Sequence, residues 1–389
     1  MINKLKYNQC TICQACINIC PSKCISLKDR NYDFLYPSID LEKCINCGLC
    51  EKVCPVINQI EIQIPIKKAY AALNLDNSIR KESSSGGIFS ALASEIIRNG
   101  GIVSGVSFDK DYNVNHIIVN ELSDLKLLRG SKYVQSYIGL IFSKIKLELD
   151  NNKRVLFSGC PCEVAGLKGF LRKKYDNLYT VDFICHGIPG SITFKEYCNI
   201  LKGKNKSEIV SFKFREKSNG WHSSRMKIEF DNNRIYSKCI TEDPYMRGFL
   251  GNIYLKASCH ECKFRNFKSG SDITLADFWG AEVVQKDIDD NKGLSAVIVN
   301  SEKGKELLSQ VKKYIYLKEV EIKEIIKYNK SLIESSLPSK DRELFFKLAY
   351  GDGYEKAFNK ICKEKSTIKF IRVLRRNLGK VKREILKKR

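Results

Sequence analysis

The N-terminal region contains one cysteine pattern twice, as CTICQACINICP at residues 10–21 and CINCGLCEKVCP at residues 44–55. Each copy has the spacing C-x2-C-x2-C-x3-C-P. In bacterial two-cluster ferredoxins, the first three cysteines of such a run bind one [4Fe-4S] cube and the fourth binds the other. The repeat therefore predicts two [4Fe-4S] clusters, one on Cys10, Cys13, Cys16 and Cys54 and one on Cys44, Cys47, Cys50 and Cys20.

Zinc is the alternative occupant of these sites, because paired CxxC motifs also bind zinc tetrahedrally. Zinc motifs usually combine two CxxC pairs or add histidine. A cysteine triplet followed by a distant Cys-Pro, present twice, favours iron and sulfide instead. Cys24 lies outside the pattern and is interpreted as a small buried hydrophobic residue.

Composition restricts the class of protein. The chain has 389 residues with 43% hydrophobic residues, which excludes a disordered chain and allows two or three domains. It has no stretch of about 18 uncharged apolar residues, and the first cysteine motif begins before a signal sequence could form. We therefore expect a cytoplasmic protein whose 17 cysteines are metal ligands, redox groups or core thiols rather than disulfides.

The cysteines divide the chain into regions. Residues 1–62 form the predicted two-cluster ferredoxin-type domain, and residues 59–65 read as an extended connector. Residues 63–150 and 151–345 read as the two parts of a mixed α/β or α+β domain, and residues 346–389 as a basic helical tail. The helical face that begins at Ile88 is expected to end at Gly100.

A β-strand, an α-helix and a second β-strand are predicted around Cys160 and Cys185. The apolar run 155–157 leads through Cys160 into a helix, and the run 180–184 ends at Cys185. Such a βαβ unit has parallel strands, whose carboxyl ends meet at one edge of the sheet, where ligands bind. We therefore expect a binding site at this edge.

A third cluster is predicted in the same region. Five cysteines compete for its four ligand positions, namely Cys160, Cys162, Cys185, Cys259 and Cys262. The other three cysteines, Cys198, Cys239 and Cys362, have no partner at ligand spacing and are interpreted as core thiols.

Two turns are candidate anion sites. The Ser/Gly run 83–87 opens the helix that begins near Ile88, so its backbone N–H groups could bind a phosphate-bearing cofactor. An ordinary N-cap is the alternative for this turn. The segment 130–135 places Lys132 beside Tyr133, and a solvated loop is its alternative.

These blocks together resemble the family of the beta subunit of coenzyme F420-reducing hydrogenase and related dehydrogenases. The resemblance rests on the fused ferredoxin motifs, on the runs 83–87 and 129–136, and on three later blocks. Those blocks are SGCPCEVAGL at residues 158–167, DFICHGIP at residues 182–189 and YLKASCHECKFRNFKSGSDITLADFWG at residues 254–280. Several blocks in the family's order, over roughly residues 1 to 300, make a chance match improbable.

The resemblance implies an oxygen-sensitive oxidoreductase that contains FAD and iron–sulfur clusters. Flavin would exchange electron pairs with a partner and single electrons with the clusters. The matching positions imply core-cluster ligands at Cys162, Cys185, Cys259 and Cys262, with Cys160 spare. They imply FAD contacts at Ser84, Ser85, Gly86, Gly87, Lys132 and Tyr133.

The redox partner stays open at the level of sequence. Coenzyme F420, ferredoxin and NAD(P)H are all candidates, and an electron-transfer protein without flavin or substrate is the alternative function. His186 is a weak candidate for a catalytic proton donor, although a histidine beside a ligand more often supports that ligand.

The C-terminal segment is strongly basic and carries an apolar stripe. Ile368, Ile371, Leu374, Leu378, Val381 and Ile385 recur at helical spacing among lysines and arginines. Such a helix favours docking through residues 366–389 to an anionic membrane surface, and packing on its own domain is the alternative. The net charge of +23 would also suit a nucleic-acid binder. Because no nucleic-acid-binding motif accompanies that charge, we expect no nucleic acid as partner.

Overall fold

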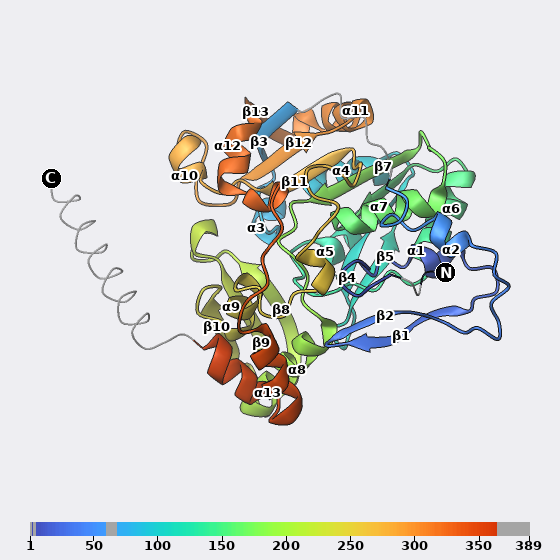
Figure 1. The fold of residues 1–389 in the computed structure, drawn as a ribbon. Coiled ribbons are helices and arrows are strands. Elements are labelled where there is room, and N and C mark those ends of the chain that lie inside the picture. The colour runs from blue at the N-terminus through green and yellow to red at the C-terminus, as the bar shows by residue number, and fades with distance from the viewer. Residues whose placement is uncertain (1, 3–4, 60–67, 364–389) are drawn as a thin grey trace.

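The computed structural model describes residue 2, residues 5–59 and residues 68–363 (Figure 1). The basic segment 366–389 and all but the first residue of the predicted connector lie outside these ranges. Within them, no helix has both the length and the apolar character needed to cross a membrane.

The N-terminal region is a small unit built around its two cysteine loops. It contains α1 (Ala15–Ile19), the antiparallel strands β1 (Ile25–Asn31) and β2 (Phe34–Ile39), and α2 (Leu49–Lys52). Phe34 and Tyr36 of β2 are buried against Ile12, which lies in the first cysteine loop. Figure 1 shows this unit in blue at one side of the molecule, near α6 and α7.

The main domain is organised around an eight-stranded mixed sheet with the strand order β13-β3-β12-β11-β7-β6-β4-β5. The central strands β4, β6, β7 and β11 are parallel, and the other pairings are antiparallel. The strands are β3 (Lys68–Asn74), β4 (Ile102–Phe108), β5 (Val114–Val119), β6 (Val155–Ser158), β7 (Leu178–Phe183), β11 (Ile273–Asp277), β12 (Ser295–Val299) and β13 (Ile315–Val320). Since β3 to β5 and the later strands share one sheet, residues 68–320 form a single domain around it.

Helices cover both faces of this sheet, which explains why its central strands are largely buried. One face packs against α4 (Ile88–Arg98), α5 (Leu125–Leu128) and α11 (Glu302–Gln310). The other packs against α6 (Ile141–Asp150) and α7 (Pro161–Leu171) at one end, and against α10 (Ala281–Val284) and α12 (Ile322–Tyr328) at the other. The short α3 (Asn77–Glu82) precedes α4. The mixed α/β class predicted from the sequence is confirmed.

The predicted βαβ unit is present as β6, α7 and β7, with the two strands parallel. Helix α7 begins where it does because Cys160 and Glu163 form a reciprocal N-terminal cap. The Glu163 carboxylate accepts a hydrogen bond from the Cys160 N–H at 2.7 Å. Because Pro161 occupies the first helical position, Cys162 lies in the first turn, at the carboxyl edge of the sheet.

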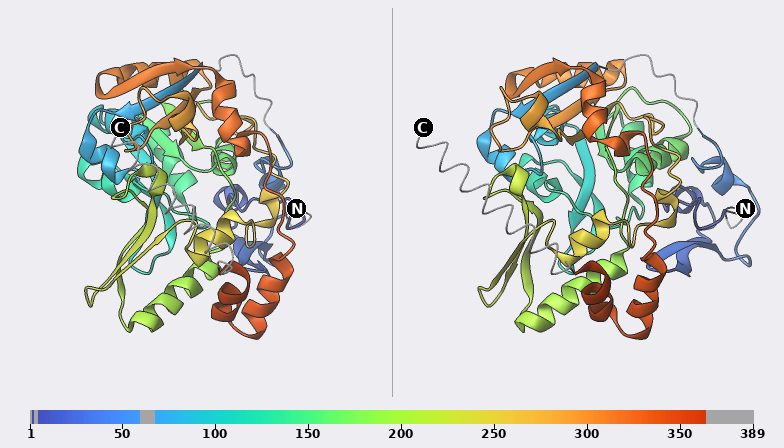
Figure 2. Two further views of the ribbon diagram at one scale, coloured as in Figure 1. Left: turned by 90° about the vertical axis from the view of Figure 1, so that its left-hand side faces the viewer. Right: turned by 60° about the vertical axis from the view of Figure 1, so that its left-hand side comes forward.

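A second layer lies beside the main sheet, on the side away from β13 (Figure 2). It contains a three-stranded sheet and helices with a shared aromatic core. Its elements are α8 (Ser191–Asn205), β8 (Ile209–Glu216), β9 (Arg225–Phe230), β10 (Ile235–Cys239), α9 (Pro244–Leu250), α13 (Arg342–Gly351) and α14 (Tyr354–Ala357). Phe346, Phe358 and Cys362 are buried in this core. We therefore propose that the folded domain extends to Cys362, beyond the predicted boundary at residue 345.

The N-terminal unit is docked on the main domain at two places. Helix α7 contacts it through two glycines, because a Cβ on Gly166 or Gly169 would collide with Cys13 or with the Val53 carbonyl oxygen. At the second place, the buried Asp33 carboxylate accepts hydrogen bonds from the hydroxyls of Thr193, Tyr350 and Tyr354. The first cluster region is thereby fixed against both layers of the main domain.

Candidate functional site

The first cysteine site predicted from the repeat is assembled in the structure. Cys10, Cys13, Cys16 and Cys54 line one cavity, closed on its outer side by Ile2 and Leu5. Burial raises the pKa of Cys10 to about 11 and that of Cys13 to about 12. Because thiolates are the ligands, a cluster entering this site must displace these protons. The donor set fits a [4Fe-4S] cluster.

The second predicted site is nearer the surface. Cys20, Cys44 and Cys50 are partly buried against one apolar cluster, whereas Cys47 is exposed. The Cys24 sulfur lies 3.4 Å from that of Cys20 and is buried, as expected for a thiol in the wall of the site. The second cluster would therefore be the one closest to solvent.

The third set gathers at the carboxyl edge of the sheet. Cys162, Cys185, Cys259 and Cys262 line a second small cavity together with Phe264 and Arg265. Cys185 follows β7, Cys259 is the last residue of the short 3-10 helix Ala257–Cys259, and Cys262 lies in the turn after that helix. Cys162 and Cys262 also pack against the apolar cluster that contains Cys16 and Cys54. The four ligands implied by the family resemblance thus surround one space, adjacent to the first ferredoxin site.

Cys160 does not line that cavity. It lines the larger cavity described below, and its thiol hydrogen-bonds with Cys185, which raises the pKa of Cys160 well above its usual value. It also caps α7, so its place in the fold is explained without a ligand role.

The spacing of the sulfurs bears on the choice between zinc and iron–sulfur. Four thiolates on one zinc ion, at bond lengths of about 2.3 Å, lie about 3.8 Å apart. In the part of the chain that the structure describes, no three cysteine sulfurs lie within 4.8 Å of one another.

A cavity of about 810 Å³ lies beside the third cysteine set. It lies at the carboxyl ends of β4, β6, β7 and β11, where the parallel strands of an α/β sheet bind ligands. Its size is within the range of cofactor pockets. Both anion-binding turns predicted from the sequence lie on its wall. Of the six residues implied for FAD, five line it, namely Ser84, Ser85, Gly87, Lys132 and Tyr133.

Gly86 is the exception. It is buried behind the turn, and its N–H donates a hydrogen bond to the Ser295 hydroxyl at 2.9 Å. A Cβ on Gly86 would lie 2.5 Å from the Ala72 carbonyl oxygen. Its role is to let the turn pass close to β3, which places the neighbouring residues on the cavity wall.

The two turns contact each other directly. The Ser84 hydroxyl oxygen accepts hydrogen bonds from the Ser131 N–H at 2.7 Å and the Ser131 hydroxyl at 2.8 Å. The Lys132 ammonium donates to the carbonyl oxygens of Leu127 and Arg129, and burial lowers its pKa to about 7. A turn at the N-terminus of α4 beside a desolvated lysine fits the pyrophosphate of a dinucleotide cofactor.

The opposite wall contains residues that sequence patterns missed. Arg215 pairs with Asp277 at 2.9 Å and lies over the Trp279 ring, and Trp279 stacks on Trp221. Lys327 and Lys330 line the same wall. Trp279 lies in a sequence block that resembles the family, and this resemblance could have identified it as a site residue. Arg215 and the two lysines come from segments with no recognisable motif.

His186, the candidate proton donor, does line this cavity. Its ring is edge-on to Phe249, with centroids 5.1 Å apart, and burial lowers its pKa. It lies next to Cys185, between the cavity and the third cysteine set.

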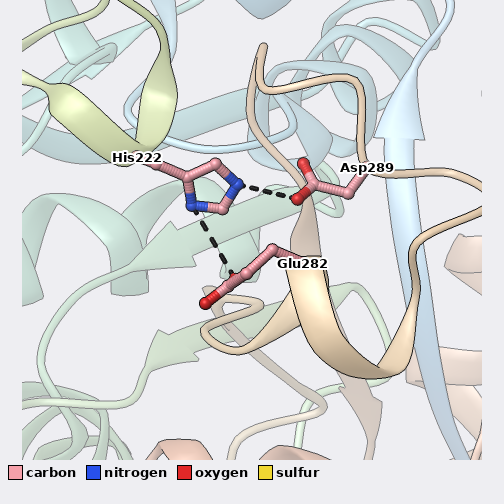
Figure 3. Close-up of side chains that lie close together, drawn as sticks. All are labelled: His222, Glu282 and Asp289. Atoms are coloured by element: carbon pink, nitrogen blue, oxygen red, sulfur yellow. Dashed lines mark hydrogen bonds and ion pairs between the residues drawn. The ribbon is translucent and has the colours of Figure 1, made fainter. Parts of the chain in front are cut away.

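A histidine between two carboxylates braces the rim of this wall (Figure 3). His222 Nε2 lies 2.7 Å from Asp289, and Nδ1 lies 3.8 Å from Glu282. The group ties the Trp221 segment to α10 and the loop after it.

Comparison with known families agrees with this geometry. Residues 9–58 match a family model described as 4Fe-4S dicluster domain. Two further models describe the beta subunit of coenzyme F420 hydrogenase/dehydrogenase. Its N-terminal model matches residues 69–140, and its C-terminal model matches residues 152–325. These two matches follow each other in order and together cover most of the main domain.

Curated relatives share low identity. The coenzyme F420-dependent sulfite reductase of Methanocaldococcus jannaschii is 23% identical over 320 residues, which cover 80% of this chain and 48% of the relative. One component of the F(420)H(2) dehydrogenase of Methanosarcina mazei, designated F, is 23% identical over 170 residues, 41% of this chain and 47% of the relative. The chain thus spans about half the length of these relatives.

A chain of the F420-reducing [NiFe] hydrogenase complex from Methanosarcina barkeri is similar in structure, with a TM-score of 0.45 and 17% identity, over 77% of this chain and 92% of that one. On the family matches, the chain belongs to the family of coenzyme F420 hydrogenase/dehydrogenase beta subunits and has a 4Fe-4S dicluster domain at its N-terminal end.

Proposed function

We propose that this protein is an oxidoreductase that transfers electrons between a two-electron carrier bound in the large cavity and a one-electron partner at the N-terminal domain. Three [4Fe-4S] clusters and one FAD would be its cofactors. The observation that carries the proposal is the continuity of the sites. The large cavity adjoins the third cysteine set through Cys185, and that set adjoins the first ferredoxin site through the apolar cluster of Cys16, Cys54, Cys162 and Cys262.

FAD, when bound, would supply the conversion between electron pairs and single electrons. The residues of the chain would bind and orient it. The turn 83–87 and Lys132 would bind the pyrophosphate, and Tyr133 with Phe249 provides an apolar wall. Arg215, fixed by Asp277 and Trp279, would present a positive charge on the other wall.

We propose coenzyme F420 as the first two-electron carrier to test. The support is the family and the two relatives named for F420. Lys327 and Lys330 also give the wall opposite the two turns a positive charge, which suits an anionic carrier. NAD(P)H is the second carrier to test, since its phosphates would meet the same charges.

We propose that single electrons pass to or from a partner protein, such as ferredoxin, at the second cluster. Its ligand Cys47 is exposed, and Ile45 beside it is 65% exposed. Electron tunnelling slows steeply with distance, so the cluster nearest the surface is the natural point of exchange.

Anaerobic purification and cofactor analysis would test the function first. About twelve irons per chain, the number for three cubane clusters, and one FAD released on denaturation are expected. About eight irons without flavin would instead identify an electron-transfer protein without a substrate of its own. Zinc in place of iron would overturn the proposal. With the expected cofactors present, reduction of F420 or NAD(P)⁺ by reduced ferredoxin would be assayed.

A further inference from the structure

A lysine is buried between the first and the third cysteine sets. Lys256 is 1% exposed. Its ammonium donates hydrogen bonds to the Thr11 carbonyl oxygen at 2.6 Å and to the Gln135 side-chain oxygen at 2.7 Å. Thr11 follows Cys10 in the first cysteine loop. The Lys256 N–H donates a hydrogen bond to the Ile188 carbonyl oxygen, and the Lys256 carbonyl oxygen accepts one from the Cys259 N–H at 2.9 Å. The residue thus links both cysteine sets.

This ammonium lacks an acidic partner. In the described ranges of the chain, no carboxylate forms a salt bridge with Lys256, although a buried charge is costly unless it is compensated. Its positive charge interacts electrostatically with cysteine sulfurs instead. It acts on Cys162 and Cys259 of the third set, and on Cys10 of the first.

Clusters on these cysteines would supply the missing negative charge. A [4Fe-4S] cluster with four thiolate ligands has a net negative charge, and reduction adds one more. The neutral acceptors Thr11 and Gln135 orient the ammonium without adding a negative charge, so its positive charge acts on both sites.

We propose that Lys256 is the shared counter-ion of the first ferredoxin cluster and the core cluster, and that its charge raises the reduction potential of both. This inference rests on the proposed function, because it requires a cluster in each site. The second ferredoxin cluster, on Cys44, Cys47, Cys50 and Cys20, lies outside the pair that Lys256 connects. A cation stabilises the reduced form of a nearby cluster, since that form is more negative. Both adjacent clusters would thereby be easier to reduce than without this charge.

The test is a potentiometric titration of the purified holoprotein, followed by low-temperature EPR of the reduced clusters. Lys256→Met keeps the length of the side chain and removes the charge. We expect the reduced-to-oxidised ratio of two of the three clusters to fall about tenfold at a fixed potential, which is 59 mV for one electron. Lys256→Arg retains the charge and is expected to restore the wild-type midpoints.

A second variant leaves the lysine in place. Gln135→Glu puts a carboxylate next to the ammonium while keeping a hydrogen-bond acceptor there. We expect it to lower the same two midpoints. A shift confined to these two midpoints would show that charge at this position acts on both clusters, and no shift would show that it acts on neither, even if Lys256→Met does not fold.

The matched control is Lys303→Met. Lys303 likewise donates two hydrogen bonds, in this case to the main-chain carbonyls of Tyr175 and Leu178, at the opposite end of β7 from Cys185. It should leave all midpoints unchanged. Suppose that the wild type has three clusters. Midpoint potentials that do not shift in Gln135→Glu, or that shift equally for all three clusters, would then overturn the role of Lys256 but not the proposed function. A wild-type protein without the core cluster would overturn this role together with the proposed function.

Discussion

A methyl group on Gly166 would lie 2.7 Å from the Cβ of Cys13, so helix α7 touches the first cysteine loop at a residue with no side chain. The same helix presents Cys162 to the third cysteine set. One short helix therefore fixes the distance between two of the proposed clusters.

Gly166→Ala is expected to disturb this contact. Overpacking a close contact costs about 1–3 kcal/mol, so the melting temperature should fall by several degrees and the first site should lose iron. Gly203→Ala is the matched control, because it also lies in a helix but its Cβ would meet no atom within 4 Å. Alanine there should stabilise the protein by about 0.5–1 kcal/mol. Equal iron content and melting temperature in the two variants would contradict the close docking.

Cys160 and Cys162 form a second matched pair. Cys162→Ser is expected to remove the core cluster, and with it about four irons per chain. Cys160→Ser should keep those irons, since Cys160 lines the large cavity and not the cysteine cavity. Iron and sulfide analysis of anaerobically purified variants would measure both. The reverse result would make Cys160 the ligand.

Lys132 gives flavin binding a predicted pH dependence. Burial lowers the pKa of Lys132 to about 7, and a bound pyrophosphate would raise it again. FAD binding would therefore take up a proton, so the affinity of the apoprotein should weaken up to about tenfold per pH unit above pH 7. Fluorescence titration between pH 6.5 and 9 would measure it.

Lys132→Met should remove this pH dependence and weaken FAD binding at least tenfold, in line with about 1.5–3 kcal/mol for a charged hydrogen bond. Lys126→Met, a nearby exposed lysine, is the control and should bind FAD as the wild type does. A wild-type affinity independent of pH would exclude this role for Lys132.

A substitution at Ile45 tests whether the one-electron partner exchanges electrons at the second cluster. Ile45→Glu is expected to slow reduction by ferredoxin about three- to tenfold without loss of iron, because a charge is placed where the partner must come close. Ile235→Glu is the control, since Ile235 is 61% exposed but lies on β10. Stopped-flow bleaching of the clusters would follow both, and equal rates would place the exchange elsewhere.

Sequence patterns were most informative where the chemistry is local. The spacing of the two cysteine runs predicted that Cys10, Cys13, Cys16 and Cys54 belong together, and these four do line one cavity. Such a pattern is readable because three ligands of each site lie in one short loop. The βαβ unit around Cys160 was equally predictable, since strand and helix periodicity is a local property.

The remaining residues could not be predicted from patterns because they act through tertiary contacts. Lys256 is one lysine among many in the sequence, and only the fold places it between Thr11 and Gln135. Arg215 reaches the large cavity from the three-stranded sheet, far along the chain from the turn at Ser84. The family resemblance supplied the core-cluster cysteines and the residues implied for FAD. Those FAD residues included Gly86, which lies behind the wall of the large cavity.

The anchoring of Asp33 also sets the order of events during synthesis. Its hydroxyl partners Thr193, Tyr350 and Tyr354 are translated long after it. At about 5–20 residues per second, the ribosome needs roughly 16–64 s to travel from Asp33 to Tyr354. For most of that interval both N-terminal cysteine loops have been made while these final contacts do not yet exist. The N-terminal unit of a newly made chain is therefore more open than in the finished fold until the last helices pack against Asp33.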